Sequence, residues 1–421
     1  MIKKILASVI IGILIFLPIA NTNDVFAATD IGNATIEWSV GSETTFLFNE
    51  IKDTPEKYFK VKLDGKSLDS SECIIQVISV NEKESKVVVQ AYGIGEYSGQ
   101  TKRITLGFDT VDFWTRLHGL NRYDTMKAIV DEGFTKKKGT VIVATGDDFK
   151  DALAASGLAG LYKAPVVLTG GKSLSNQARA VLSRLEPEKI YVIGGEFAIR
   201  DNVLAQIEMT TGIRPDRVYG DSSSSTSAAI AREGYGLWKG STAIIVTNRS
   251  FKDALSIAPI AYVKGYPILL SDQGKELSDD VVRAMKEVGI RQVIIVGGTS
   301  AVSNDVESEL YREGFAVDKR IEGLNGVLTS KAVAEWGISV GMKADRMGVA
   351  TSQNYPDALA GAALCGYNGA VLVLADDKAM LNASFPAKYK SAIRRGYVFG
   401  GLSAVGQKTY DKLVESVAEI V

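Results

Sequence analysis

The sequence predicts an α/β protein of three similar tandem units, each built around a parallel β-sheet, with a small all-β domain before them. The tripeptide Asp-Ala-Leu begins at Asp151, Asp253 and Asp357, which are 102 and 104 residues apart. A double glycine follows each of these aspartates after 43 or 44 residues. Two separate motifs that share one period indicate duplicated structural units.

Within a repeat, short apolar runs alternate with helical segments. In the first repeat the predicted strands are Thr140–Gly146, Pro165–Thr169 and Lys189–Ile193. The predicted helices are Asp151–Lys163, Ser173–Leu185 and Ile199–Met209. Continuous apolar runs indicate strands that are buried on both faces, and alternation with helices indicates βαβ units. We therefore expect three Rossmann-like domains, at 113–214, 215–317 and 318–421.

Further motifs recur with the same period. Each repeat opens with Arg-x-x-Gly, and a threonine follows six residues after that glycine. The arginines are Arg116, Arg217 and Arg320, and the threonines are Thr125, Thr226 and Thr329. The second strand starts at Pro165 and Pro267 in two repeats, whereas Val371 stands there in the third.

Residues 28–112 differ from the repeats. Runs such as YFKVKL and KVVVQAYG are β-rich, with a predicted hairpin loop at Asn81–Ser85. About 85 residues suffice for a small β-sandwich or barrel. This segment has a net charge of −5, whereas the repeats have a net charge of +3. A polyanionic partner would therefore favour the repeats.

Residues 1–27 have the three-part pattern of a secretory signal peptide, with two lysines, an apolar run and a predicted cleavage after Ala27. The alternative is an uncleaved membrane anchor, but the run is shorter than the ~20 residues needed to span a bilayer. The sequence thus predicts a secreted protein without a membrane segment after signal removal.

Composition narrows the chemistry. The chain has one histidine, His118, two cysteines, Cys73 and Cys365, and a net charge of −1. These counts argue against a structural zinc site and against a dedicated nucleic-acid-binding protein. No complete G-x-G-x-x-G occurs at the double glycines, so no dinucleotide cofactor is predicted, and we expect neither a metal nor another cofactor.

The repeated residues each allow two or more roles. The double glycines could seat phosphate at a helix N-terminus or form tight turns. The three arginines could pair with a carboxylate of a neighbouring unit or bind phosphate. Arg122 has no arginine counterpart in the other repeats, so a ligand role there would make the units unequal. The candidate ligand-binding residues are Arg116, Arg122, Arg217, Arg320, Gly194, Gly195, Gly297, Gly298, Gly400 and Gly401.

Asp151, Asp253 and Asp357 are expected at helix starts, as caps or at an interface between repeats. A shared site on a pseudo-threefold axis, or a catalytic carboxylate pair, is a further alternative. One aspartate per repeat favours an architectural role.

Together these motifs resemble the cell wall-binding repeat 2 family of exported clostridial proteins. The resemblance covers about 113–421 and implies three repeats that pack as a pseudo-trimer of Rossmann-like or Toprim-like domains. It also implies non-covalent binding of an anionic secondary cell-wall polysaccharide, with a variable module held at the cell surface. It does not extend to residues 28–112, and Val371 departs from its proline-led strand.

The sequence therefore favours a secreted, non-enzymatic protein of the cell wall and cell surface that binds this polysaccharide and displays its N-terminal module. One alternative is a wall hydrolase with a carboxylate pair. Another is an adhesin whose N-terminal module binds a host protein or another surface protein.

Overall fold

The computed structural model describes residues 28–39, 51, 54–81, 86–107, 114–390, 392–393 and 395–417. The chain divides into two compact units, Met1–Val111 and Asp112–Val421, which are described separately. The predicted signal peptide and most of the predicted hairpin loop (82–85) lie outside the described residues. No helix within the described part is both long and apolar enough to cross a bilayer.

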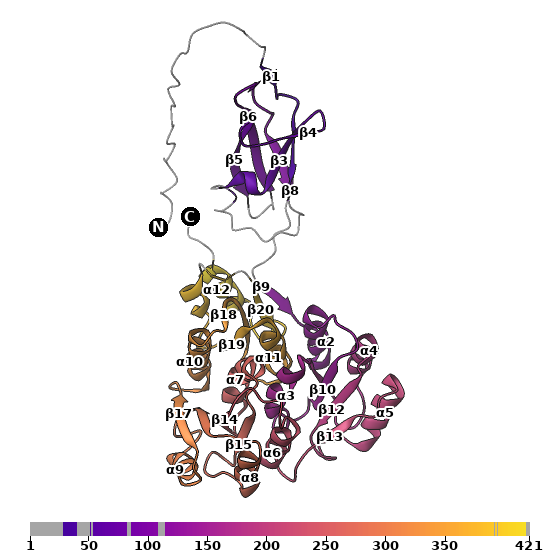
Figure 1. Cartoon of the computed structure of the whole chain (residues 1–421), viewed down its shortest axis with the longest axis vertical. Coiled ribbons are helices and arrows are strands. Elements are labelled where there is room, and N and C mark those ends of the chain that lie inside the picture. The colour runs from indigo at the N-terminus through magenta and orange to yellow at the C-terminus, as the bar shows by residue number, and fades with distance from the viewer. Residues whose placement is uncertain are drawn as a thin grey trace. The chain divides into compact units, whose positions relative to one another are not determined.

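The first unit is a small all-β domain, as predicted (Figure 1). Its antiparallel sheets are β2–β3–β4 and β5–β6–β8, and β1 pairs in parallel with β7. The strands are β1 (Thr29–Asp30), β2 (Thr35–Trp38), β3 (Phe59–Leu63), β4 (Lys66–Leu68), β5 (Cys73–Asn81), β6 (Lys86–Gly93), β7 (Tyr97–Ser98) and β8 (Ile104–Gly107). A short 3₁₀ turn, Pro55–Lys57, precedes β3. Phe59, Val61, Val87 and Val89 fill the core because alternate strand residues face the same side.

The second unit contains three four-stranded parallel sheets with one strand order. The first is β11 (Val166–Thr169), β10 (Thr140–Thr145), β12 (Lys189–Ile193) and β13 (Asp216–Val218). The second is β15 (Ile268–Ser271), β14 (Thr242–Thr247), β16 (Gln292–Val296) and β17 (Ala316–Ile321). The third is β19 (Ala370–Ala375), β18 (Lys343–Thr351), β20 (Arg395–Phe399) and β9 (Trp114–Leu117).

The last strand of each sheet comes from the repeat that follows it in sequence. Strand β13 carries Arg217 and pairs with β12, and β17 carries Arg320 and pairs with β16. The third sheet takes its last strand from the start of the unit, because β9 with Arg116 pairs with β20. Each sheet therefore crosses a sequence-repeat boundary, and the three repeats close into a ring (Figure 1).

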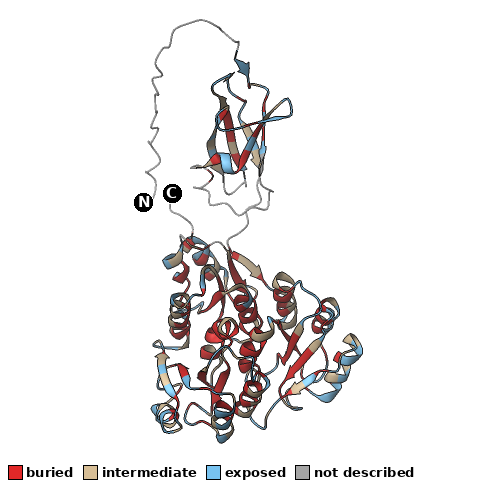
Figure 2. Cartoon of the chain, in the orientation of Figure 1, coloured by how far each residue is buried: buried red, intermediate tan, exposed pale blue. Residues whose placement is uncertain are grey.

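The three Asp-Ala-Leu segments lead into helices that pack against one another at the centre of this ring. They are α3 (Ala155–Tyr162, after a 3₁₀ turn at Ala152–Ala154), α7 (Phe251–Lys264) and α11 (Pro356–Asn368). Small residues allow the close approach, since a Cβ added at Gly160 would lie 2.0 Å from the Tyr262 carbonyl oxygen. Figure 2 shows these helices buried, as expected of segments that are apolar around most of their circumference. The predicted pseudo-threefold arrangement is confirmed.

The remaining helices surround the sheets, and α2 and α10 also pack against the central helices α11 and α7. They are α2 (Arg122–Gly133), α4 (Asn176–Leu185), α5 (Asp201–Thr211), α6 (Ser223–Glu233), α8 (Asp279–Glu287), α9 (Asn304–Arg312), α10 (Gly326–Ser339) and α12 (Gln407–Val417). In the third repeat, a 3₁₀ segment at Phe385–Tyr389 follows β19 at the place that α4 and α8 occupy in the other two.

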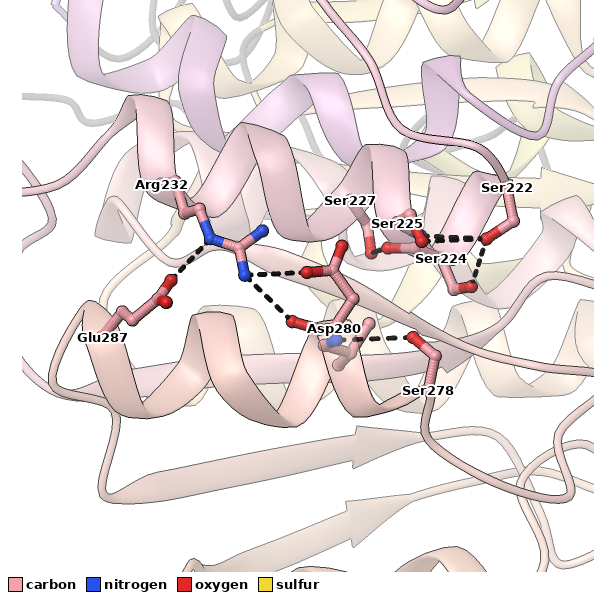
Figure 3. Close-up of polar contacts among 9 residues, drawn as sticks. Ser222, Ser224, Ser225, Ser227, Arg232, Ser278, Asp280 and Glu287 are labelled. Carbon is pink, nitrogen blue, oxygen red and sulfur yellow. Dashed lines mark hydrogen bonds and ion pairs between the residues drawn. The ribbon is translucent and has the colours of Figure 1, made fainter.

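Helices α6 and α8 illustrate how local sequence sets these packings (Figure 3). The Ser222 hydroxyl accepts from the Ser225 amide and caps α6, and Ser278 caps α8 in the same way. At the other end of α6, Arg232 pairs with Asp280 and Glu287 of α8 at 2.8 and 2.5 Å. Caps and ion pairs thus fix both ends of the helix pair.

Candidate functional site

The repeated motifs meet wherever one repeat joins the next, at the carboxyl ends of the strands. We call these places seam 1/2 (Asp151, Gly194, Arg217, Thr226), seam 2/3 (Asp253, Gly297, Arg320, Thr329) and seam 3/1 (Asp357, Gly400, Arg116, Thr125). In each seam the aspartate and the glycine come from one repeat, and the arginine and the threonine come from the next. The carboxyl edge of parallel strands is where α/β proteins generally bind ligands.

In seam 1/2 the Arg217 guanidinium holds the turn that follows β12. It donates to the Gly194 carbonyl at 2.7 Å and pairs with Asp201 at 2.8 Å. The Gly194 amide in turn donates to the Val218 carbonyl at 2.9 Å. The arginine therefore fastens the edge strand of one repeat to the turn and helix of the preceding repeat.

The other two arginines do the same. Arg320 donates to the carbonyls of Gly297 and Val302 at 3.0 and 2.8 Å and pairs with Glu307 at 2.7 Å. Arg116 donates to the carbonyls of Gly400 and Val405, both at 2.9 Å, and lies 4.8 Å from the Tyr410 ring centroid. Each of the three arginines therefore uses guanidinium N–H groups for hydrogen bonds within the protein.

The first glycine of each pair is required by the turn. Gly194, Gly297 and Gly400 have φ values of +108°, +116° and +106°, where a side chain is strained. A Cβ there would also lie 2.9, 2.8 and 2.5 Å from a carboxylate oxygen of Asp151, Asp253 and Asp357.

The double glycine does not lie at a helix N-terminus, because a turn separates it from the helix. In the first repeat α5 begins at Asp201, six residues after Gly195. The Gly195 carbonyl accepts from the amides of Ala198 and Ile199 within this turn. The geometry is that of a tight turn, the second of the two roles that the sequence allowed.

Two of the three aspartates interact with a threonine of another repeat. Asp151 makes no side-chain cap hydrogen bond, and Ser250 caps α7. The Thr226 hydroxyl lies beside the Asp151 carboxyl, and the Thr125 hydroxyl lies beside the Asp357 carboxyl, so each aspartate interacts with another repeat. Burial raises the pKa of both carboxyls, and the threonine hydroxyls oppose that rise.

Asp253 differs from its two counterparts. Its side chain is 4% exposed, and its Oδ1 has no hydrogen-bond partner among the described residues. Burial raises the pKa of this carboxyl to about 6. Seam 2/3 therefore holds a carboxyl that is partly neutral near pH 6.

Arg122 lies in seam 3/1 and is also used internally. It donates to the Gly146 carbonyl, which also accepts the Tyr355 hydroxyl at 2.9 Å. Its counterpart Ser223 accepts from the Asn248 amide at 3.2 Å. The side-chain contacts at this position therefore differ between the first and second repeats, and a ligand role for Arg122 stays a prediction.

Sequence reasoning missed an aromatic cluster at the centre of the ring. Phe149, Phe251 and Tyr355 lie two residues before the three aspartates, and their ring centroids are 5.4–6.0 Å apart. An aromatic residue at one fixed position in all three repeats was the available signal. These edge-on and tilted aromatic contacts join the starts of the three central helices.

Exposed apolar side chains lie on the loops that follow the double glycines and the Arg-x-x-Gly motifs. Leu120, Phe197 and Leu324 are 101%, 109% and 96% exposed. Leu402 is exposed as well. These residues occupy equivalent positions in the repeats, although a single exposed apolar residue on a loop is normal for a protein surface. We call these loops the carboxyl-edge loops.

The described residues provide no group of three or more histidine, cysteine, aspartate and glutamate side chains that could hold a metal ion. Cys73 and Cys365 are both buried and free. The predicted absence of a metal and a cofactor stays a prediction.

Two curated relatives match the repeat region. The N-acetylmuramoyl-L-alanine amidase LytC of Bacillus subtilis (strain 168) is 26% identical over 302 residues, which is 72% of this chain and 58% of the relative. The amidase enhancer of the same organism is 28% identical over 309 residues, 73% of this chain and 41% of the relative. The chain thus spans about half the length of these relatives.

Two solved structures have similar folds. Cwp6 from Clostridium difficile matches with a TM-score of 0.65 and 16% identity over 86% of this chain and 65% of that one. Cwp8 from Clostridium difficile matches with a TM-score of 0.62 and 22% identity, over 91% of this chain and 63% of that one.

The model of the family Cell wall binding domain 2 matches three times, at residues 116–204, 217–307 and 320–410. Each match begins at the arginine of an Arg-x-x-Gly motif and extends past the double glycine. Together the matches span well over half of the chain. The chain therefore belongs to the Cell wall binding domain 2 family.

Proposed function

We propose that this protein binds an anionic cell-wall polysaccharide non-covalently through its three repeats and displays its N-terminal β domain at the cell surface. The family match over all three repeats carries this proposal, since the family is one of wall-binding domains. The charge distribution supports it, because the repeats carry a net +3 and residues 28–112 a net −5. In this proposal residues 1–27 direct export and are then removed.

The contacts in the seams refine the proposed binding residues. The guanidinium groups of Arg116, Arg217 and Arg320 are engaged by turn carbonyls, so we assign them the positioning of the carboxyl-edge loops. The loops themselves, with their exposed apolar tips, would contact the polymer. With such loops at all three seams, the ring would bind one polymer chain with avidity, because the second and third contacts form at high effective concentration.

A test is sedimentation of the full chain with cell-wall sacculi before and after acid removal of secondary polymers. Binding that disappears on stripping is expected. Because the repeats carry a net +3, binding should also weaken between 50 and 500 mM salt, which screens their attraction to an anionic polymer. Equal binding to stripped sacculi would identify peptidoglycan as the ligand, and absence of binding to both would contradict the proposal.

The hydrolase alternative needs two carboxylates roughly 5–10 Å apart across an open cleft. The repeated aspartates do not favour it, since Asp253 is almost fully buried and Asp151 and Asp357 bond threonines. The matched repeats are binding domains, so we propose that the chain is not an enzyme. Release of soluble fragments from sacculi by the purified chain would contradict this.

The N-terminal domain has its own core and its own fold, so its role is separable from wall retention. We propose that it binds another surface protein or a host protein. Removal of residues 28–112 should leave wall sedimentation unchanged and abolish that second interaction.

A further inference from the structure

A cavity of about 260 Å³ lies at the opposite edge of the first sheet, at the amino ends of β10 and β11. Phe134, Lys136, Tyr162 and Lys163 of the first repeat line it, and Tyr367 at the end of α11 contributes from the third repeat. It therefore lies where repeats 1 and 3 meet, away from the carboxyl-edge loops. Its volume is just below the roughly 300 Å³ at which drug-sized pockets begin, which suits one or two sugar rings.

Lys163 holds an unusual backbone conformation in the wall of this cavity. It ends α3 in the left-handed region, with φ +53° and ψ +37°. The same position is Gly265 after α7 and Gly369 after α11, with φ +63° and +72°. The backbone of Lys163 is strained in this conformation, which the other two repeats allow with glycine. Backbone strain of this kind is concentrated at functional sites.

The lysine side chain changes how the surrounding space is filled. In the second and third repeats the stems of Lys239 and Lys343 lie over the glycine, 3.0 and 3.5 Å from where its Cβ would be. Their counterpart in the first repeat is Lys137, because each of the three lysines lies 14 residues before the aspartate of its Asp-Ala-Leu motif. Lys137 instead pairs with Glu186 at 2.5 Å. The space that a lysine stem covers in two repeats is thus left open in the first.

Aromatic rings form the walls of the cavity. Tyr367 is 43% exposed and packs against Phe134 with ring centroids 4.8 Å apart. The Tyr162 hydroxyl is held by the Tyr191 hydroxyl at 3.2 Å, which fixes the ring. Leu161 and Val263 occupy the position of Tyr367 at the other two junctions, so an aromatic wall is specific to this one.

The charged groups that line the cavity are both cationic. Lys136 and Lys163 are exposed, and neither has an ion-pair partner within the described residues. Flat aromatic faces pack against the C–H faces of sugar rings, and two free ammonium groups attract an anionic substituent. The set of groups matches a sugar that carries a phosphate or a carboxylate.

We propose that this cavity between repeats 1 and 3 binds one anionic sugar unit of the wall polymer, with Tyr367 against the ring and Lys163 and Lys136 on the charged group. This rests on the proposed function, because it names a subsite for the same class of polymer. It also makes the three repeats unequal, with one specific pocket beside three loop contacts.

The test measures binding of N-acetylglucosamine 1-phosphate to the full chain by calorimetry, with N-acetylglucosamine as the uncharged probe. Lys163→Gly introduces the glycine that stands at this position in the other two repeats. Tyr367→Leu introduces the leucine that stands at the equivalent position of the first repeat. Each should weaken binding of the phosphorylated sugar about tenfold, the effect of about 1.4 kcal/mol. Lys331→Ala, which removes an exposed lysine on α10, is the charge-matched control and should bind as the wild type does.

Wild-type-like affinity in both cavity variants, within twofold, would overturn the proposal, as would equal binding of the uncharged probe. Sacculus sedimentation separates the two proposals. If the wild type sediments with walls while the cavity variants bind the probe unchanged, only the subsite is wrong. If the wild type does not sediment, the proposed function fails, and saturable binding of the phosphorylated sugar would still support the cavity as an anionic-sugar site.

Discussion

Seam 3/1 and seam 1/2 share the contact between an arginine and a glycine carbonyl, but their residues have very different positions in the chain. Arg217 reaches the Gly194 carbonyl across 23 residues, whereas Arg116 reaches the Gly400 carbonyl across 284. The entropy of closing the longer loop costs about 2 kcal/mol more. The same geometry nevertheless forms, which shows that the residues of the seam determine it and that proximity along the chain does not.

The two seams also differ in what surrounds the edge strand. In the chain, β13 lies between the repeat whose sheet it joins and the rest of its own repeat. Strand β9, by contrast, is the first strand of its unit. Additional contacts secure β9, because Trp114 is buried and its carbonyl accepts the Tyr410 hydroxyl at 2.9 Å. These contacts offset the larger cost of closing the ring.

The largest expected effect tests whether the seams are equivalent. Gly194→Ala, Gly297→Ala and Gly400→Ala should each lower the free energy of unfolding by about 3 kcal/mol or more, because a positive φ and a carboxylate clash coincide. Chemical denaturation measures this. Gly195→Ala is the control, since its Cβ would meet nothing nearer than 3.5 Å and it should be nearly neutral. Unequal costs among the first three would show that the seams are not equivalent.

The next effect separates seam 2/3 from the others by pH. The pKa of Asp253 is raised to about 6, from the 3.8 of a free carboxyl. Its folded state therefore holds a proton that its unfolded state releases, so stability falls as pH rises from about 4 through 6. Relative to wild type, Asp253→Asn should gain up to about 3 kcal/mol between pH 4 and pH 7.

Thermal denaturation at several pH values measures this difference. Asp151→Asn is the matched control, because the Thr226 hydroxyl opposes the rise in the pKa of Asp151, and this variant should show a smaller pH-dependent gain. A pH-independent difference between wild type and Asp253→Asn would contradict the assignment of a raised pKa.

Hydrogen exchange can compare seam 3/1, which closes the ring, with seam 1/2, whose partners are close in the sequence. Arg116→Ala should cost about 2 kcal/mol, because it removes charge-assisted bonds to two carbonyls. The amides of β9 should then exchange about thirty-fold faster, as local opening becomes easier. Arg217→Ala should accelerate exchange in β13 less than Arg116→Ala does in β9. One of the two contacts of Arg217 is with the exposed Asp201, and such a contact contributes little. Equal protection of the two strands in both variants would contradict this.

The smallest effect concerns Lys163. Lys163→Gly should raise the free energy of unfolding by about 0.5–1 kcal/mol, since relief of left-handed strain exceeds the entropy that glycine adds to the unfolded chain. Gly265→Lys is the converse and should destabilise, because Lys239 lies 3.0 Å from the new Cβ. A destabilised Lys163→Gly would show that this lysine is not strained.

Much of the fold could be predicted from the sequence. The strand at Lys189–Ile193 was predicted at its observed bounds, and the helix at Ile199–Met209 lies at Asp201–Thr211, shifted by two residues. The helix predicted from Asp151 begins with a 3₁₀ turn and becomes α-helical at Ala155. Continuous apolar runs and a strict period give a strong signal, whereas the residues at helix ends are decided by local capping.

The sites were less predictable. The sequence identified the glycines, arginines and aspartates as important, but not that they contact one another across repeats. The predicted partner of each arginine was a ligand or a carboxylate, and the structure adds backbone carbonyls of the turns. Because any residue has a backbone carbonyl, the sequence gives no signal for such a partner. The aromatic cluster of Phe149, Phe251 and Tyr355 was visible in an alignment of the repeats and was missed.

The sequence by itself determined the repeat, the parallel sheets and the identity of the seam residues, because periodicity and apolar patterning are local properties of the chain. Only the tertiary structure decided that each Arg-x-x-Gly strand joins the sheet of the preceding repeat and that β9 closes the ring onto β20. It also decided that Asp253 lacks the threonine contact of its counterparts and that a cavity opens beside Lys163. These features depend on how side chains fill the space between different repeats, which no local pattern records.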